Sequence, residues 1–236
     1  MGRLRVREVA SVVLASVPLA AVAVGSALLG SPPKRSASPP AVATPAVPEP
    51  VLREGLLAMY GLSRRTTWLV TFEYHRRTAA GGRLDLRLTE LNRPPDHLTS
   101  GLGGISGRVG DRKVACNEVD GRRLCGPDGP DVPFDEETSA QLGELRDVLQ
   151  PPAQWYAVES GPPRVVIGER AACYALRRIV NVPDPPYGER AEYCFAGDGV
   201  PLLTRIERRE GTDERVAVAV SRRVGDGDVQ ALLAAG

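Results

Sequence analysis

The chain has 236 residues, with 30 Lys and Arg against 29 Asp and Glu, and a formal net charge of +1. No stretch is strongly of one sign, so the chain lacks the basic surface that nucleic-acid binding requires, and we expect no nucleic-acid partner. Its length beyond residue 50 is that of one domain.

The N-terminal segment has the order of charged and apolar residues that is typical of a membrane anchor. Residues 1–8 contain three arginines, and residues 9–30 contain no charged residue. About 20 apolar residues suffice for a transmembrane helix, and the positive-inside rule places residues 1–8 in the cytoplasm. We therefore expect a single-pass cell-membrane protein with an uncleaved signal-anchor. The alternative is a cleaved signal peptide, because small residues at 25–27 suit a peptidase.

A lipid anchor is not expected. The sequence SALLGS resembles a lipoprotein signal, but Ser31 stands where the lipidated cysteine would be. Residues 31–50 are rich in Pro, Ala and Ser and indicate an extended linker. The extracytoplasmic domain is expected over residues 51–236, opening with an amphipathic helix that Gly61 ends.

An amphipathic β-hairpin is predicted after this helix, because residues 67–75 and 83–88 alternate on either side of a Gly-Gly turn. One face of the hairpin is apolar and the other is charged. The apolar face could line a cavity, or it could be an ordinary core packed under a helix. The residues of this possible apolar cavity are Trp68, Val70, Phe72, Tyr74, Leu84, Leu86 and Leu88.

A tight hairpin is predicted around Asp120-Gly121, a pair typical of a two-residue type I′ turn. Counting outward places Cys116 opposite Cys125 in a non-hydrogen-bonded pair, where Cα atoms approach most closely. The same register pairs Glu118 with Arg123.

The other two cysteines repeat this pattern around a Pro-rich loop. Cys173 and Cys194 are equidistant from Pro183–Pro186, which cannot continue a central strand. The symmetry favours the pairs Cys116–Cys125 and Cys173–Cys194, although four cysteines allow other connectivities. A metal site or free thiols are the alternatives, and an exported domain favours disulfides.

The remaining elements complete an α+β pattern. A helix is predicted from Asp135, its N-cap, to Leu149, with a buried stripe of Leu142, Leu145 and Leu149. A meander of strands follows, in which Val216, Val218 and Val220 alternate with smaller or polar neighbours and so share one face. All connections are short, so the sheet is expected to be antiparallel. The fold class is a curved antiparallel sheet, a half-open β-barrel, with helices packed on its concave face.

No catalytic constellation is visible in the sequence. His75 and His97 are expected to be surface residues, no Gly-x-Ser-x-Gly motif is present, and the carboxylates are scattered. We therefore expect no enzyme, no metal and no cofactor.

Four stretches resemble the superfamily of LolA, LppX and RseB/MucB. They are LLAMYGLSRRTTWLVTFEY, GGRLDLRLTELNRPPDHL, ISGRVGDRKVACN, and the paired-cysteine hairpin leading into Gly199-Val200-Pro201-Leu202, which is common in exported actinobacterial members. The resemblance implies an extracytoplasmic half-barrel closed by helices.

Two functions follow as expectations. The first is a membrane-tethered domain that binds an apolar ligand such as a lipid or lipopeptide. The second is an RseB-like envelope sensor or regulator that contacts a neighbouring membrane protein, because an uncleaved anchor and a linker would confine the domain near the bilayer. An enzyme of unrecognised type is a third and weaker alternative.

Overall fold

The structure is a computed structural model that describes residues 47–101, 103–120 and 122–234. The expected transmembrane helix at 9–30 lies outside the described residues. Within them, no helix is both long and apolar enough to cross a membrane.

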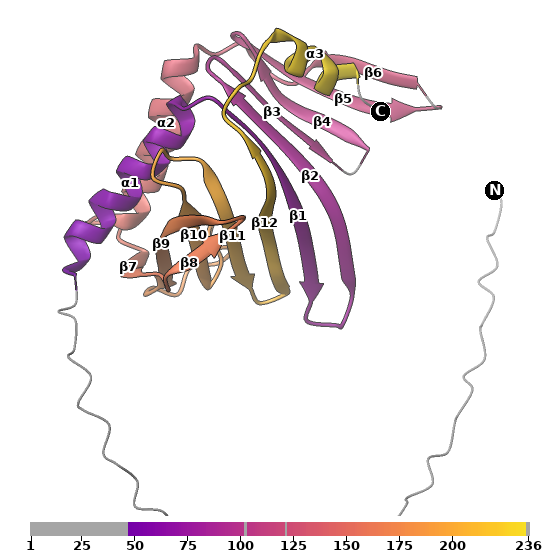
Figure 1. Cartoon of the computed structure of the whole chain (residues 1–236). Helices are drawn as coiled ribbons and strands as arrows, with labels where there is room; N and C mark the ends of the chain where they lie inside the picture. Colours follow the sequence, from indigo (N-terminus) through magenta and orange to yellow (C-terminus); the bar gives the residue numbers. More distant parts are fainter. Residues whose placement is uncertain (1–46, 102, 121, 235–236) are drawn as a thin grey trace, which may run out of the picture. The chain divides into compact units, whose positions relative to one another are not determined.

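The described residues form three helices and twelve strands (Figure 1). The helices are α1 (Glu49–Arg65), α2 (Phe134–Leu149) and α3 (Asp226–Ala234). The first six strands are β1 (Trp68–Thr78), β2 (Arg83–Arg93), β3 (Asp96–Gly101), β4 (Gly104–Val109), β5 (Arg112–Val119) and β6 (Arg122–Pro127). The other six are β7 (Tyr156–Ser160), β8 (Arg164–Val166), β9 (Glu169–Arg178), β10 (Arg190–Phe195), β11 (Pro201–Arg208) and β12 (Gly211–Ser221).

The strands form one open antiparallel sheet. Its order is β6-β5-β4-β3-β2-β1-β12-β11-β10-β9-β7, and β8 pairs with β9 beside β7. The first and last strands of the order do not pair, so the sheet does not close into a barrel. This arrangement confirms the α+β class and is consistent with a half-barrel. The Pro94-Pro95 stretch is the turn of the β2–β3 hairpin, because Arg93 pairs with Asp96.

The sheet has two chemically different faces, since successive side chains of a strand point to opposite sides. We call the face against which α1 and α2 pack the inner face and the opposite one the outer face. Helix α3 packs on the outer face, where Val229 contacts Leu91, Leu98 and Ile105. The prediction that the helices share one face is therefore wrong for α3. That short helix covers the apolar outer residues of β2–β5 that would otherwise be exposed to water.

Helix α1 ends four residues later than Gly61 predicts. Its last carbonyl groups accept hydrogen bonds from the side-chain amide of Asn92 on β2, with N–O distances of 3.2 Å at Ser63, 3.1 Å at Arg64 and 2.6 Å at Thr66. A helix C-terminus leaves such carbonyls without partners inside the helix. Asn92 is fully buried and supplies the partner, so a contact with a distant strand sets the end of the helix.

Helix α2 begins at Phe134, and Asp135 lies in its first turn rather than at the N-cap. The N-cap residue is Pro133, whose side chain makes no hydrogen bond to the first turn of the helix. The acidic first turn still suits the positive end of the helix dipole. Leu145 and Leu149 are buried, as the predicted stripe requires, and pack with Leu56 and Leu57 of α1.

The predicted alignment of Val216, Val218 and Val220 on one face is wrong. The pairing of β1 with β12 shifts between Thr71 and Phe72, which face Ala219 and Ala217. Val218 is therefore the extra residue of a β-bulge and reverses the alternation of β12. Val220 lies on the inner face and Val216 on the outer face.

Both predicted hairpins are confirmed in register. Cys116 pairs with Cys125, Glu118 with Arg123, and Cys173 with Cys194. Both cysteine pairs are disulfide-bonded, with Cα–Cα distances of 4.0 and 4.1 Å. Asp120 has a φ of 52°, the positive value that the expected turn requires.

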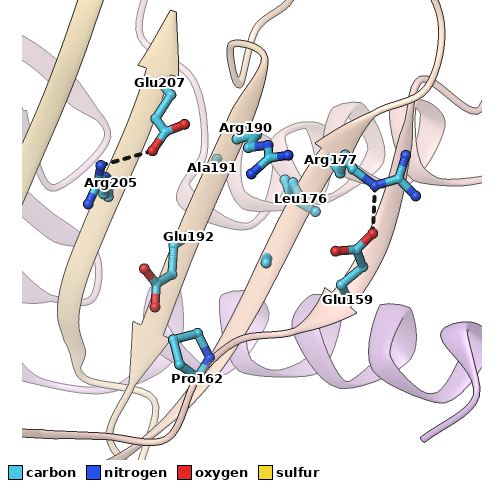
Figure 2. A pocket seen from close by; sticks show the side chains of 10 residues that line it. Glu159, Pro162, Leu176, Arg177, Arg190, Ala191, Glu192, Arg205 and Glu207 are labelled. Atoms are coloured by element: carbon cyan, nitrogen blue, oxygen red, sulfur yellow. Dashed lines mark hydrogen bonds and ion pairs between the residues drawn. The ribbon is translucent and has the colours of Figure 1, made fainter. Parts of the chain in front are cut away.

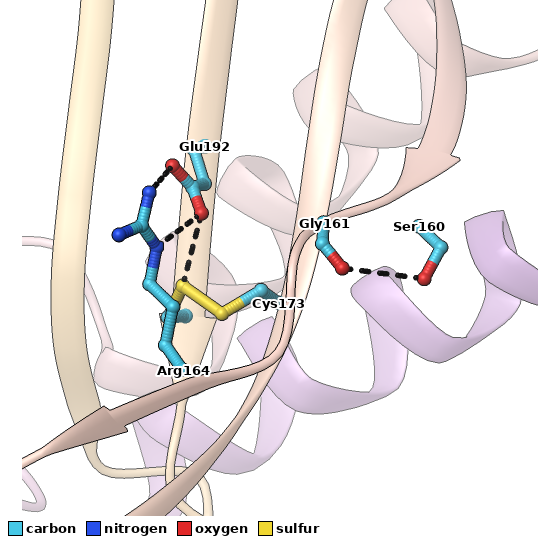
Figure 3. Close-up of a disulfide and its surroundings, with 6 residues drawn as sticks. Ser160, Gly161, Arg164, Cys173 and Glu192 are labelled. Carbon is cyan, nitrogen blue, oxygen red and sulfur yellow. Dashed lines mark hydrogen bonds and ion pairs between the residues drawn. A yellow bond between two sulfur atoms is a disulfide. The ribbon is translucent and has the colours of Figure 1, made fainter. Parts of the chain in front are cut away.

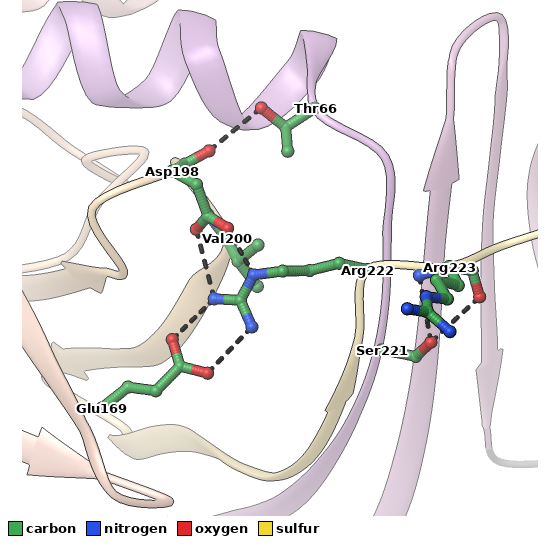
Figure 4. A network of polar contacts seen from close by, with 7 residues as sticks. All are labelled: Thr66, Glu169, Asp198, Val200, Ser221, Arg222 and Arg223. Atoms are coloured by element: carbon green, nitrogen blue, oxygen red, sulfur yellow. Dashed lines mark hydrogen bonds and ion pairs between the residues drawn. The ribbon is translucent and has the colours of Figure 1, made fainter.

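A charged cluster on Arg222 joins three parts of the chain at the end of β12 (Figure 4). Its guanidinium contacts Asp198, with the closest approach at the Nε atom, and both carboxylate oxygens of Glu169 at 2.9 and 2.6 Å. Hydrogen bonding by Arg222 lowers the pKa of Asp198. Thr66, just after α1, donates to the Asp198 carbonyl at 3.0 Å. This cluster ties the β10–β11 turn to the start of β9 and the end of α1.

Candidate ligand-binding face

The seven residues proposed for an apolar cavity all lie on the inner face. Phe72 pairs with Leu88, Tyr74 with Leu86, and Arg76 with Leu84. Residues directly opposite each other in an antiparallel pair share a face. The outer side of the same hairpin carries Glu73, His75, Arg83, Asp85 and Arg87, as the alternation predicts.

Three of the seven belong to the hydrophobic core. Trp68, Val70 and Phe72 are buried against Ala196, Val200, Leu202 and Ala217. The indole N–H of Trp68 donates to the Ser63 carbonyl at 3.0 Å. These three side chains pack against other residues of the protein, as predicted by the alternative that the apolar face is an ordinary core.

The other four form a partly open strip, which we call the open inner face: Tyr74, Leu84, Leu86 and Leu88. The Leu84 side chain is 40% exposed, and the other three are half-buried. The free ends of β1 and β2 extend beyond α1 and α2 in Figure 1, so neither helix covers them. That these four residues line a ligand site stays a prediction.

A polar contact fixes Tyr74 at the edge of this strip. Its hydroxyl donates to Asp213 at 2.6 Å. Partial burial and the neighbouring carboxylate raise the pKa of Tyr74, so the phenol is neutral at physiological pH. The open inner face therefore presents apolar groups and a neutral phenol, and it is bordered by the ion pair of Arg76 with Asp213 at 3.6 Å.

A partly buried ion pair separates the open inner face from the rest of the inner face. Arg215 contacts the carboxylate of Glu90, and its guanidinium lies 5.7 Å from the centre of the Phe72 ring. Glu90 is almost fully buried, whereas the Arg215 side chain is 35% exposed, so only the carboxylate of the pair is shielded from water. Its position beside Phe72 places a fixed charge pair at the inner end of the apolar strip.

Three tyrosines pack together below α1. The ring centres of Tyr156 and Tyr187 are 5.7 Å apart, and those of Tyr187 and Tyr193 are 6.2 Å apart. Burial raises the pKa of Tyr187 to about 12 and raises that of Tyr193 further. These hydroxyls are therefore protonated across the physiological range and are unsuited to act as general bases.

The two histidines have different environments, and only one matches the sequence-based expectation. His75 lies on the outer face, where its Nδ1 is 2.6 Å from Asp85. His97 is not a surface residue. It lies on the inner face against Trp68, with ring centres 6.2 Å apart, and its shielded Nδ1 has no hydrogen-bond partner. Burial, then the nearby Arg64, lowers the pKa of His97 to about 3.

The outer face carries a charged hollow of about 240 Å³ on β7, β9, β10 and β11. Figure 2 shows its side chains on the side of the sheet away from the helices. Arg177 pairs with Glu159 at 2.6 Å, and Arg205 with Glu207 at 2.9 Å. Since these opposite charges are paired with each other, the hollow resembles a solvated strand surface.

The second disulfide lies beside a carboxylate (Figure 3). Cys173, Cys194 and Glu192 place potential ligand atoms within 4.8 Å of one another. However, both sulfur atoms are in the disulfide, and Arg164 binds the Glu192 carboxylate at 2.7 and 2.8 Å. Metal ligation by cysteine requires thiolates, so this cluster does not fit a metal ion.

Sequence reasoning missed that three arginines are shielded from water to different degrees: Arg108 is buried, and Arg64 and Arg215 are half-buried. Each of these arginines belongs to a stretch of mixed charge, and such a stretch is typical of a solvent-exposed surface. The alternation of side chains along β4 gave one indication for Arg108, because it places this arginine on the same face of the sheet as Ser106. The burial of that face under α2 could not be read from the strand alone.

No family model matches the chain, and no curated protein sequence matches it. Solved structures that resemble it include MucB in complex with MucA(peri), at 17% identity and a TM-score of 0.41, covering 78% of this chain and 59% of that one. The MucA/MucB complex of Pseudomonas aeruginosa has 19% identity and a TM-score of 0.43, covering 79% and 61%. The Mycobacterium tuberculosis lipoprotein LppX has 13% identity and a TM-score of 0.42, covering 75% and 99%.

The chain thus spans about three fifths of the length of the two MucB chains it matches. At these TM-scores the likeness carries no conclusion about function. The solved structures that it matches include MucB and LppX, which belong to the superfamily that the sequence motifs resemble, and membership of that superfamily stays a prediction.

Proposed function

We propose that this protein is a non-enzymatic extracytoplasmic domain that binds an apolar lipid chain on the open inner face and is tethered to the membrane by residues 9–30. The observation that carries the proposal is the leucine strip of β2. Leu84, Leu86 and Leu88 project to the inner side at alternate positions and keep exposed surface, although the outer side of the same strand is charged.

The chemistry of the strip suits an acyl chain. An exposed apolar strip on an otherwise charged sheet is a typical ligand or partner site. The strip follows one strand, so its shape matches an extended chain rather than a compact ring system. The two disulfides support the extracytoplasmic location, because such bonds persist in oxidising compartments.

The test is photo-labelling of the full chain in liposomes that contain a phospholipid with a photoactivatable acyl chain. We expect adducts on the β2 peptide, reduced about tenfold or more in Leu86→Gln, because that change removes the apolar contact of a whole side chain. Arg87→Gln is the matched control, since the neighbouring residue faces the outer side and its labelling should not change. Labelling confined to residues 9–30, with none on β2, would contradict the proposal.

A second candidate is an interaction module that contacts a neighbouring membrane protein, and the β8–β9 turn favours it. Val165 is 68% exposed and Ile167 is 42% exposed. Ile167 has a φ of 48°, which costs a β-branched residue about 1–2 kcal/mol. Beside this tip is a hollow of about 540 Å³ lined in part by Leu203 and Val216. A strained and exposed apolar tip is typical of a contact site.

A photo-reactive amino acid placed at position 167 in the native host tests this second candidate. We expect one discrete adduct with an integral membrane protein, which should be absent when the same group is placed at the exposed Arg122 on the opposite edge strand. Adducts with lipid alone, or equal protein labelling from both positions, would exclude a specific partner at this tip.

A further inference from the structure

A polar hollow of about 270 Å³ lies between the end of α1, the start of α2 and strands β3–β5, apart from the open inner face. Its lining includes Arg64, His97, Ser106, Lys113 and Gln141. Ligand pockets are usually about 300–1,000 Å³, so this hollow suits a small group rather than a whole lipid. Ser106 and Asp128 at its rim are exposed, which leaves it open to solvent.

Several shielded polar atoms around this hollow have no hydrogen-bond partner. They include the Nε of Arg64, the Nδ1 of His97 and the Oε1 of Gln141. Buried polar atoms are almost always paired in folded proteins, so such a group of orphans requires an explanation. Three orphans on the lining of one solvent-open hollow leave hydrogen-bonding capacity that water or a polar ligand can fill.

Two carboxylates line the hollow, Asp128 and Glu137, and neither pairs with Arg64. Glu137 is occupied by Arg108, which contacts it closely, and by Lys113 at 3.6 Å. Among the residues that the structure describes, no carboxylate lies within ion-pair distance of the Arg64 guanidinium. Burial lowers the pKa of Arg64, but arginine is effectively always protonated in proteins. Arg64 is thus a half-buried cation without a counter-ion.

The available groups share one function as hydrogen-bond donors. Arg64 only donates, Ser106 can donate through its hydroxyl, and neutral His97 can carry its proton on Nδ1. Lys113 also only donates, and it keeps donors free besides its contact with Glu137 at 3.6 Å. The amide of Gln141 can be turned so that its NH₂ group takes the place of the orphaned oxygen. A hollow that is lined by several hydrogen-bond donors and one positive charge suits a ligand with negatively charged oxygen atoms.

We propose that this hollow is a binding site for a small oxyanion, either a carboxylate or a phosphate group, with Arg64 as its counter-ion. The site is independent of the lipid chain proposed above. It lies at the Trp68 end of β1, whereas the open inner face lies toward the Tyr74 end. A phosphate could come from free solution or from a lipid headgroup, and the same hydrogen-bond donors would serve both.

The experiment uses the two histidines of the chain as reporters. The full chain, labelled with ¹³C at histidine Cε1 and held in uncharged dodecyl maltoside, is titrated at pH 7 and constant ionic strength. The probes are inorganic phosphate, acetate and glycerol 1-phosphate, with sodium chloride as the reference. Replacing His75 with Gln assigns the two signals.

We expect phosphate or acetate to shift the His97 signal with a dissociation constant on the order of 1 mM or below, while His75 on the outer face does not respond. Arg64→Gln should weaken binding about tenfold or more, because it removes a charge-assisted hydrogen bond. Arg65→Gln is the matched control. The neighbouring Arg65 is exposed and pairs with Asp135 at 3.7 Å, so binding should be retained.

The outcomes separate the sources of the ligand. Tighter binding of glycerol 1-phosphate than of phosphate would identify a headgroup site, and tighter binding of acetate would identify a carboxylate site. An absence of any His97 response to all three probes would overturn the proposal. An equal response in Arg64→Gln and the parent chain would also overturn it. The far-UV circular dichroism of both arginine variants shows whether they are folded.

Discussion

Arg108→Met is expected to destabilise the domain by about 3–5 kcal/mol, the typical cost of removing one partner of a buried ion pair. The Arg108 side chain is 3% exposed. It donates to the Gly110 carbonyl at 2.9 Å and the Val132 carbonyl at 2.7 Å, contacts Glu137 of α2, and lies over the Phe134 ring. Without it, Glu137 keeps only Lys113 as a cation. Urea unfolding at pH 7 measures the change.

Arg177→Met is the matched control for this prediction. Arg177 also pairs with a glutamate, Glu159 at 2.6 Å, but both side chains are about half exposed. Exposed pairs contribute about 0–1 kcal/mol. The double variant Arg108→Met with Glu137→Leu should recover much of the loss, because no buried charge is left alone. Equal destabilisation by Arg108→Met and Arg177→Met would show that the buried pair has no special role.

Mild acid is expected to destabilise the domain through His97. In the unfolded chain this imidazole has its ordinary pKa of about 6.5, whereas burial lowers the pKa to about 3 in the folded state. Between these values the unfolded state binds the additional proton, so stability falls as the pH decreases. The slope approaches about 1.4 kcal/mol per pH unit, which gives a loss of about 2–3 kcal/mol between pH 6.5 and 4.5.

In this pH window the protonation of His97 is separated from that of Asp85 and Asp198. The pKa values of Asp85 and Asp198 are lowered, so their contribution is lost mainly at lower pH, through protonation below about 4. His97→Phe keeps a ring against Trp68 and should flatten the pH dependence of the unfolding free energy between pH 6.5 and 4.5. His75→Phe on the outer face is the matched control for replacing a histidine ring by a phenyl ring. A parent chain with no slope in this window would show that His97 is solvated.

The open inner face was predictable from the sequence in part. The period-two pattern of residues 68–88 correctly places all seven apolar residues on one side of the hairpin. It does not tell which of them are covered. Trp68 and Leu84 look equivalent in the pattern, yet Trp68 is packed under Val200 and Leu202 while Leu84 extends beyond the helices. Coverage depends on where α1 and α2 cross the sheet, and no local signal contains that information.

The polar hollow was not predictable from the sequence. His97 follows two prolines, so the sequence predicts that it belongs to a turn. Arg64 precedes Arg65, and the sequence predicts that both arginines are exposed. The hollow exists because β3 and β4 place His97 beside Ser106 and Arg108, and because α1 extends far enough to bring Arg64 above them. The contact between Asn92 and the end of α1 determines that extent.

By itself, the sequence determined the features of this protein that depend on neighbours along the chain. The Asp-Gly and Pro-rich turns set the registers of two hairpins, and those registers bring Cys116 to Cys125 and Cys173 to Cys194. Only the tertiary structure decided the side of the sheet on which α3 packs, the bulge at Val218 and the burial of Arg108 and His97. A turn fixes its own hairpin through backbone geometry within a few residues. The face that a helix covers is chosen by the total apolar surface that the whole domain buries.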